Sequence, residues 1–261
     1  MLLGVNIDHI AVLREARQIN DPNPLDALGI CKRAGADQIT IHLREDRRHI
    51  VDADARNIIN LSTIPVNLEC SINDEIIDIV CDLNPHRVTL VPENRAEVTT
   101  EGGLDLEGNF TQIQRVINRL HNQGIAVSLF IDPSTKMIEL SAKMEVEWIE
   151  IHTGKFANIY AMLNSGLEKT HHSIKELELP RAQLSKMLVQ SIEEINSASQ
   201  LASKTYDIKV AAGHGLNYQN VKYITQINEI IELNIGQSII ARSVFTGLEN
   251  AIVEMKDLIV E

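Results

Sequence analysis

Short apolar runs alternate along the chain with longer segments of helical periodicity. The runs are rich in Val, Ile and Leu, as strands are, and they occupy residues 2–8, 38–43, 65–69, 86–91, 125–132, 148–154, 207–213 and 229–236. A helix-like segment follows each run, such as residues 52–61 and 73–83. Because the runs carry apolar residues on both faces, they are typical of a parallel sheet that helices cover on both sides.

Local signals mark where several helices begin and end. Gly35 and Gly124 stand between a helical segment and the next strand, where glycine commonly ends a helix. Asn73 or Asp74 can accept the first backbone N–H groups of the helix over residues 73–83. These signals support the division into alternating strands and helices.

Eight strand–helix units within 261 residues predict an α/β fold, a single (β/α)₈ TIM barrel domain that spans residues 1–261. The alternative is an open, doubly wound sheet. That fold would need a glycine-rich phosphate turn after the first strand, and the sequence there, VNIDHIAV, contains no glycine.

The segment between the sixth and seventh strands is long for a plain barrel. Pro180 suits the start of a helix. The following apolar residues share one helical face: Leu184, Leu188, Ile192 and Ile195. We therefore expect an extra helical segment of two pieces, joined by an irregular stretch around residues 170–180. The adjacent His171 and His172 in that stretch would be poor co-ligands of a metal, and an exposed loop is the simpler interpretation.

The overall charge restricts the partners. With 24 Lys and Arg against 36 Asp and Glu, the formal net charge is −12, and such a surface repels nucleic acids and anionic membranes. No apolar run reaches the length of a membrane span, and the N-terminus resembles a first strand rather than a signal peptide. The three cysteines fit neither a disulfide framework nor a zinc site, which favours a cytoplasmic location.

One stretch departs from this acidic background. HLREDRRHI, residues 42–50, contains seven ionisable side chains among nine residues, three of them arginines. Arg44, with Arg17 elsewhere in the chain, suits phosphate because guanidinium groups are planar and permanently charged. Arg47 and Arg48 have the weaker claim, since surface arginines commonly just face water or an acid. A local positive cluster on an acidic chain indicates a site for a small anion.

Polar and ionisable residues gather where the predicted strands end. In a barrel this edge carries the active site. These residues are Asn6, Asp8, His9, His42, Glu69, Glu93, Asp132, Glu150, His152 and His214. Glu69 favours a functional role because a buried carboxylate without a partner is costly. Glu150 could instead form a structural ion pair, and His152 could be a histidine with a purely local partner.

Glycines add two signals at the same edge. His214 stands between Gly213 and Gly215, and glycine allows a ligand to approach the backbone closely. In NIGQSIIA a strand, Gly236 and a helix start at Gln237 follow one another, and backbone N–H groups at such a helix start bind phosphate. This helix start and the arginine set are two separate phosphate signals, which suit one bisphosphate or two monophosphates.

These motifs resemble the pyridoxine 5′-phosphate synthase family nearly from end to end. The strings that carry the resemblance are NIDHIAVLREAR, AGADQITIHLREDRRHI, VNLE, LVPENRAEVTTEGGLD, VSLFID, IEIHTG, AGHGLNYQNV and ELNIGQSIIARSVFTGL. The resemblance implies a transferase that condenses 3-amino-2-oxopropyl phosphate with 1-deoxy-D-xylulose 5-phosphate to pyridoxine 5′-phosphate, phosphate and water. It also implies that the enzyme uses no metal and no organic cofactor. The assembly that it implies is a homo-oligomer of eight chains.

The resemblance assigns roles to matching positions. His42 and Glu69 would be proton acceptors, His214 a proton donor, and Glu150 would stabilise a transition state. The residues that would contact the deoxyxylulose phosphate are Asp8, His9, Arg44, His49 and Thr99. Those that would contact the aminoketone phosphate are Asn6, Arg17, Gly215, Gly236 and Gln237.

Two features depart from the family pattern, and two other functions stay open. Gln237 stands where a histidine is expected, and the segment before the seventh strand is longer than in compact members. Another phosphosugar aldolase or isomerase could use the same barrel, although no predicted strand ends in a lysine for a Schiff base. A non-catalytic sensor would need Arg44 and the phosphate-binding amides but would have no use for Glu69 or His214.

Overall fold

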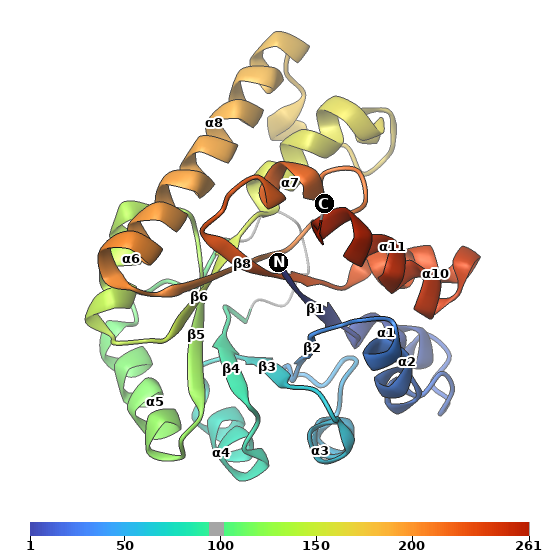
Figure 1. The fold of residues 1–261 in the computed structure, drawn as a ribbon, viewed down its shortest axis with the longest axis vertical. Helices are drawn as coiled ribbons and strands as arrows, with labels where there is room; N and C mark the ends of the chain where they lie inside the picture. The colour runs from blue at the N-terminus through green and yellow to red at the C-terminus, as the bar shows by residue number, and fades with distance from the viewer. Residues whose placement is uncertain (94–101, 261) are drawn as a thin grey trace.

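Eight parallel strands close into a barrel in a computed structural model of the chain, which describes residues 1–93 and 102–260 (Figure 1). The strands neighbour one another in chain order, β1 to β8, and β1 pairs with β8. Their bounds are β1 Leu2–Asn6, β2 Gln38–His42, β3 Val66–Cys70, β4 Arg87–Leu90, β5 Ala126–Ile131, β6 Trp148–His152, β7 Lys209–Gly213 and β8 Ile230–Ile235. The predicted (β/α)₈ barrel is confirmed, and the open sheet is excluded.

Helices surround the barrel. They are α1 Asp8–Glu15, α2 Ala27–Arg33, α3 Asp52–Leu61, α4 Asp74–Leu83, α5 Phe110–Asn122, α6 Thr135–Lys143, α7 Gly154–Tyr160, α8 Arg181–Gln200, α9 Val221–Thr225, α10 Gln237–Thr246 and α11 Leu248–Val260. The Asn73 side chain accepts the Glu75 N–H at the start of α4, and Gly35 and Gly124 have positive φ after α2 and α5, as predicted.

Helix α1 was not predicted, because the first strand was expected to run to residue 8. Strand β1 instead ends at Asn6, whose side-chain oxygen accepts the Asp8 backbone N–H at 2.9 Å. This side-chain turn ends the strand and starts a helix at once. Asp8 and His9 therefore lie in the first turn of α1 rather than in a strand.

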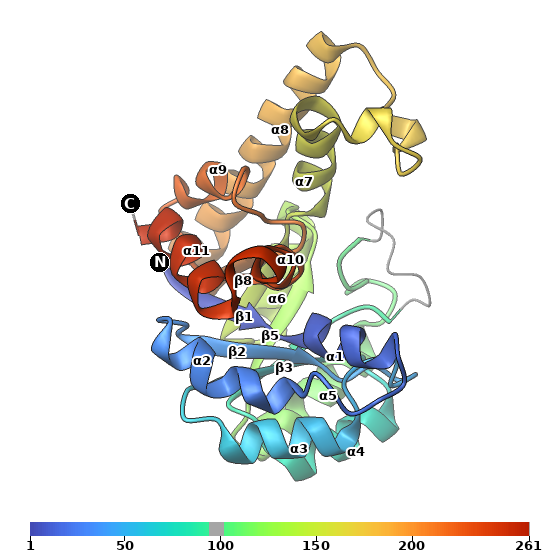
Figure 2. The same cartoon turned by 90° about the vertical axis from the view of Figure 1, so that its right-hand side faces the viewer.

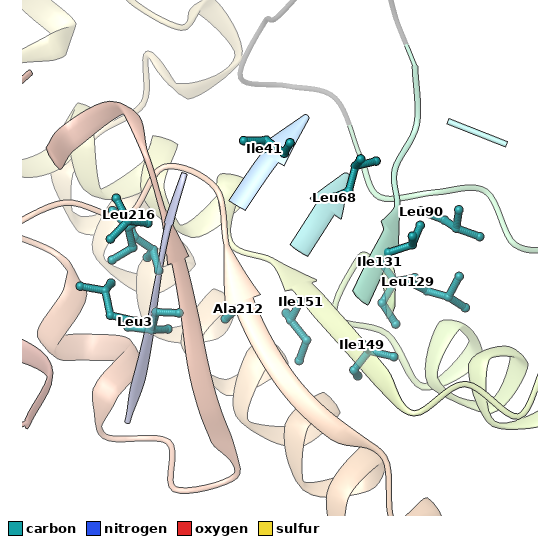
Figure 3. Packing of buried hydrophobic residues seen from close by; sticks show 14 of the residues in the cluster. Leu3, Ile41, Leu68, Leu90, Leu129, Ile131, Ile149, Ile151, Ala212 and Leu216 are labelled. Atoms are coloured by element: carbon teal, nitrogen blue, oxygen red, sulfur yellow. The ribbon is translucent and has the colours of Figure 1, made fainter. Parts of the chain in front are cut away.

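The two faces of the strands differ more than the sequence suggested. Apolar side chains such as Leu3, Ile41 and Leu68 are fully buried in the core that includes residues of the surrounding helices (Figure 3). Hydrogen bonds between non-adjacent strands show that polar residues fill the interior of the barrel. Gln38 of β2, for example, contacts Glu232 of β8 at 3.2 Å. The expectation of apolar residues on both faces was wrong: the interior is held by hydrogen bonds.

The segment between β6 and β7 projects from the barrel as a helical extension. It consists of α7, which continues as a π-helical turn, two 3₁₀ turns at Leu167–Lys169 and Lys175–Leu177, and then the long α8 (Figure 2). Leu184, Leu188 and Ile195 are buried and Ile192 is partly buried, as their spacing predicts. Two helical pieces joined by an irregular stretch are confirmed. Among the described residues, no helix combines the length and apolar character that crossing a membrane requires.

Candidate active site

A cavity of about 470 Å³ opens at the carboxyl ends of the strands. Most of the predicted site residues line it: Asn6, Asp8, His9, His42, Arg44, His49, Glu69, Glu150, His214, Gly215, Gly236 and Gln237. Arg17 does not belong to this lining and lies exposed in the turn after α1. Thr99 lies outside the described residues. The barrel topology thus brings predicted residues from the ends of six strands, β1, β2, β3, β6, β7 and β8, to one cavity, as the strand-end pattern predicted.

The first loop is fixed by hydrogen bonds around Asp8. Asn6 donates its side-chain N–H to Asp8 Oδ2 at 2.9 Å, and the His42 backbone N–H donates to Asp8 Oδ1 at 2.9 Å. Asp8 is buried and is the first residue of α1, where the helix dipole favours a negative charge. The ends of β1 and β2 are therefore joined through one carboxylate.

The arginines that follow β2 have two different environments, one beside the cavity and one at the surface. Arg44 is buried beside the cavity, whereas Arg47 pairs with Asp52 at 2.8 Å and Arg48 with Asp46 at 2.6 Å. The hydrogen bond from Arg48 is the main cause that keeps the pKa of Asp46 below its ordinary value. The interpretation that Arg47 and Arg48 pair with acids or face water is confirmed.

Arg14 holds this stretch in place and was missed by the sequence analysis. From α1 it donates to both carboxylate oxygens of Asp54 in α3, at 3.0 and 2.8 Å, and to the backbone oxygen of His49 at 2.9 Å. Bidentate pairs of this kind are strong and directional. The signal available in the sequence was weak, because a single arginine on a helix gives no indication of its partner.

Two carboxyl groups in the cavity differ from ordinary surface acids. Burial, and then the neighbouring Glu150 and Asp8, raise the pKa of Glu69 well above its usual value. Burial likewise raises the pKa of Glu150 to about 7, although a hydrogen bond from Asn234 at 2.7 Å opposes the shift. With this pKa, Glu150 can exchange protons near neutral pH. The structural ion pair considered for Glu150 is not formed with any residue that the structure describes; its hydrogen-bond partner is the neutral Asn234.

His214 directly follows β7, in a backbone conformation with φ of 79°. Thr153 supports this turn by donating its hydroxyl to the carbonyl oxygens of Gly213 and His214, both at 2.6 Å. A side chain at position 213 would lie 2.1 Å from the Glu150 carboxylate, so glycine there leaves room for Glu150. Glycine at position 213 is thus explained by the space that the Glu150 carboxylate needs.

His152, at the end of β6, forms a second pair at this side of the cavity. Its Nδ1 lies 3.1 Å from Asp132 Oδ1, and its ring centroid lies 5.0 Å from that of His214. The hydrogen bond with His152 is the main cause that lowers the pKa of Asp132. His152 therefore has the local carboxylate partner that one reading of the sequence allowed, while it also lines the cavity.

The start of α10 completes the cavity. Gly236 and Gln237 line it, and a side chain at position 236 would lie 2.9 Å from the Asn6 Cβ. The first N–H groups of a helix have no acceptor within the helix, and they carry the positive end of its dipole. This arrangement suits a phosphate, as predicted from the sequence.

The chemistry available is that of acids, bases and anion contacts. Within the described residues, no group of three His, Cys, Asp or Glu side chains is arranged to hold a metal ion. The described part of the lining also includes no lysine, which disfavours a Schiff-base aldolase. A barrel with paired acids and bases beside a helix start belongs to the enzymes that act on small phosphorylated metabolites.

Comparison with known proteins narrows this class to one family. The family described as pyridoxal phosphate biosynthesis protein PdxJ matches residues 3–261. A protein of Aliarcobacter butzleri (strain RM4018) named pyridoxine 5′-phosphate synthase is 71% identical over 259 residues, which cover 99% of each chain. One of Sulfurovum sp. (strain NBC37-1) with the same name is 66% identical and covers 99% of this chain and 100% of its own length. The chain therefore belongs to this family of enzymes.

Solved structures support the fold alone. Phosphoribosyl anthranilate isomerase from Thermococcus kodakaraensis superimposes with a TM-score of 0.57 and covers 99% of this chain and 98% of its own. The two sequences are only 13% identical. The shared feature is the barrel, and the function follows from the family and the cavity.

Proposed function

We propose that this cavity condenses 3-amino-2-oxopropyl phosphate with 1-deoxy-D-xylulose 5-phosphate to form pyridoxine 5′-phosphate, inorganic phosphate and water. The observation that carries the proposal is the meeting of Glu69, Glu150, His42 and His214 in one cavity beside the start of α10. An amine adds to a ketone, water and phosphate leave, and a carbon–carbon bond closes the ring. Each step moves a proton, so several acid–base groups are needed around the same substrates.

The proton acceptors in this proposal are His42 and Glu69. Their side chains lie next to each other, with Nδ1 of His42 4.0 Å from Oε2 of Glu69. Burial and nearby carboxylates make the Glu69 carboxylate a stronger base than a surface glutamate, because they raise its pKa. His214, which lines the same cavity just after β7, is the proton donor in this proposal.

Glu150 stabilises a transition state in this proposal. With a pKa of about 7 it is partly protonated near neutrality, so it can donate a hydrogen bond to a developing oxyanion or accept one from a developing cation. The hydrogen bond from Asn234 fixes its orientation. The space left by Gly213 lets its carboxyl reach the cavity.

Two phosphate positions are proposed within the cavity. The aminoketone phosphate would bind to Asn6, Gly215 and the amides of Gly236 and Gln237, a position that α10 supports through its dipole. The role of Arg17 at this phosphate rests on the family resemblance alone, because its side chain is exposed outside the cavity.

The deoxyxylulose phosphate would bind on the side of the arginine-rich stretch. Asp8, His9, Arg44 and His49 all line that part of the cavity. Thr99, which the resemblance adds to this set, lies outside the described residues. A buried arginine is a strong phosphate ligand, which favours Arg44 as the main cationic contact.

Turnover of the two purified substrates tests the proposal directly. The expected result is the appearance of pyridine absorbance together with release of one equivalent of inorganic phosphate. A sensor would bind the two phosphates, as calorimetry would show, without forming product. Binding without any turnover would contradict the proposed function and favour the sensor.

We also propose that the chain forms a homo-oligomer, an octamer as the family resemblance implies. Support comes from apolar side chains on α10 and on the neighbouring α1 and its following turn. Phe245 and Val244 are 86% and 69% exposed, and Leu13 and Ile19 are 49% and 53% exposed. Large exposed apolar surfaces commonly mark interfaces. Light scattering should give eight times the chain mass, and a monomer at micromolar concentration would contradict the proposal.

We further propose that the protein is located in the cytoplasm. Cys31, Cys70 and Cys81 are free, and burial raises the pKa of the Cys31 thiol to about 12. Unpaired, unreactive thiols are typical of reducing compartments. Fractionation of cells that express the native protein is the measurement, and recovery outside the cytoplasm would contradict it.

A further inference from the structure

The imidazole of His42 lies between two carboxylates. Its Nδ1 is 4.0 Å from Glu69 Oε2, and its Nε2 is 3.6 Å from Glu93 Oε2. Glu69 lines the cavity, whereas Glu93, which follows β4, does not belong to the described lining. The ring therefore has one nitrogen toward a group that shares the substrate cavity and one nitrogen toward an acid outside it.

Glu93 is held from one side, which leaves its other oxygen for His42. Oε1 accepts the backbone N–H of Glu45 at 3.2 Å and lies 3.4 Å from the guanidinium of Arg44. Oε2 faces His42, and the Glu93 side chain is only 12% exposed. These contacts fix the direction in which the carboxylate points.

The two facing atoms are unusual. Within residues 1–93 and 102–260, Glu93 Oε2 and His42 Nε2 are both buried without a hydrogen-bond partner at normal distance. Two buried polar atoms without hydrogen bonds lower the stability of the folded protein. Their position opposite each other therefore indicates a functional role. Burial alone would raise the pKa of Glu93, but contacts with His42 and Arg44 outweigh it and lower the pKa, so Glu93 is charged at neutral pH.

We infer that Glu93 is a positioning residue for His42: its carboxylate binds the Nε2 proton, which directs the Nδ1 lone pair toward the cavity. This inference rests on the proposed role of His42 as a proton acceptor. When Nδ1 takes a proton from substrate carbon, the C–H electron pair stays on the substrate and His42 becomes an imidazolium. Glu93 stays ionised and stabilises that cation through the Nε2–H contact, in the way a carboxylate orients the histidine of a catalytic triad.

A purely structural ion pair is the competing explanation. The charged and titratable groups around His42 are Glu69 from β3, Glu93 after β4, and Arg44, His49 and Asp8 from the loops after β2 and β1. If Glu93 served only to hold Arg44, its loss would weaken phosphate binding and leave the proton transfer unchanged. The two explanations thus affect different kinetic constants.

The variant Glu93→Gln removes the charge and keeps the shape. We expect kcat to fall about 100-fold, the scale of general acid–base assistance, while KM for either substrate changes by less than about threefold. Because a nearby carboxylate favours the protonated form of an imidazole, the acidic limb of the pH–rate profile should move to lower pH. Glu45→Gln is the matched control, since it removes an adjacent surface carboxylate that faces Ser71, and it should leave kcat within about twofold.

A second variant protects the test against a folding defect. Glu93→Asp keeps the charge but shortens the reach, and it should lose about tenfold in kcat with the acidic limb near its wild-type position. Rescue of this kind is expected of a positioning carboxylate. A kcat within threefold of wild type in folded Glu93→Gln, or a loss confined to KM, would overturn the inference.

A measurement without turnover separates this inference from the proposed function. In protein labelled with ¹⁵N-histidine, the His42 ring signals are identified by their absence in His42→Gln. At fixed pH near neutrality, Glu93→Gln should reduce protonation at Nε2, and Glu45→Gln should not. If the wild type made no product while this pairing was observed, the proposed function would fail and the His42–Glu93 pairing would stand. Unchanged ring signals in Glu93→Gln would remove the pairing, whatever the turnover.

Discussion

Both ends of the barrel interior contain buried carboxyl groups, but the charges of the neighbouring side chains differ between the two ends. At the amino-terminal end, Arg87 of β4 forms an ion pair with Glu232 of β8, and Gln38 adds hydrogen bonds to both. At the carboxyl-terminal end, Glu69 is next to further acids, and Glu150 receives its hydrogen bond from an uncharged amide. Both ends are buried, so burial alone does not distinguish them.

The difference lies in the counter-charge. A buried carboxylate beside an arginine can stay ionised, and its charge is satisfied by the pair. A buried carboxylate among other carboxylates has a raised pKa, so it takes up a proton at a higher pH than a paired one. Asn234 connects the two ends, since its side chain donates to Glu150 at 2.7 Å and also lies 3.3 Å from Glu232. The barrel therefore places a structural ion pair, Arg87 with Glu232, at one end of its interior and the reactive carboxyl groups of Glu69 and Glu150 at the other.

The largest expected effect comes from neutralising a reactive carboxylate. Glu69→Gln should fold normally and lose at least about 1,000-fold in kcat, because the amide cannot accept the substrate proton. Steady-state kinetics with circular dichroism as the folding control is the measurement. Near-normal turnover by a folded variant would show that Glu69 belongs with the structural charges.

Breaking the structural pair should affect stability instead. Arg87→Met leaves Glu232 buried without its cation, and we expect a loss of about 3 kcal/mol in the free energy of unfolding. The double variant Arg87→Met with Glu232→Gln should recover a large part of this loss, because no unpaired charge then remains. Urea unfolding of the two variants measures the free energy of unfolding. Equal losses in the single and the double variant would show that the packing of Arg87 over Trp148, at 4.3 Å, is the main contribution to stability.

The pH dependence of stability tests Glu150 in the folded state. Its pKa of about 7 lies above the ordinary 4.5, so the folded protein binds the extra proton more tightly than the unfolded chain. The stability that this provides is complete below about pH 4.5 and is lost as the pH rises toward 7. Relative to Glu150→Gln, wild-type stability should therefore decline across this window. A difference that does not change with pH would place Glu150 among the fully paired charges.

A smaller effect is expected where charge is kept but geometry is lost. Arg44→Lys retains the positive charge but not the planar fork, so KM for 1-deoxy-D-xylulose 5-phosphate should rise about tenfold. KM for the aminoketone phosphate should change little. If the aminoketone affinity fell instead, the two phosphate assignments would have to be exchanged.

The smallest effect is expected at Gln237. The start of α10 holds phosphate through backbone N–H groups, so Gln237→His should change the apparent aminoketone affinity by less than about threefold. Measurements at neutral and acidic pH would detect a contribution from a charged imidazole. Tightening of tenfold or more, strongest at acidic pH, would show that the side chain at 237 is itself a ligand.

Local and periodic features made most of the fold predictable. Alternating apolar runs located all eight strands, Asn73 and Pro180 marked helix starts, and strand-end polar residues located the cavity. The polar interior was not predicted, because Gln38 and Glu232 become partners only when β2 and β8 face each other across a closed barrel. The two residues are 194 positions apart in the sequence, so the contact has no local signal.

The same limit applied to individual site residues. Glu93 was visible at a strand end, but only the folded chain shows that it faces His42. Arg14 had no feature in the sequence to connect it with Asp54 and His49. Arg17 was assigned to phosphate by its permanent charge and by resemblance, and the fold leaves it outside the cavity that it was expected to serve. Pairings between distant segments decide such roles, and periodicity does not encode them.

The hydroxyl of Thr153 has a consequence for the helical extension that follows it. Because Thr153 fastens the end of β6 to the carbonyls of Gly213 and His214, the point where the chain leaves for α7 is anchored to the end of β7. The chain returns from α8 to the other end of that strand, at Lys209, so strand ends hold the extension at both of its bases. Residues 170–178 lie between these two anchored points and do not line the cavity, so a fluorescent label or an immobilisation tag there should leave turnover unchanged.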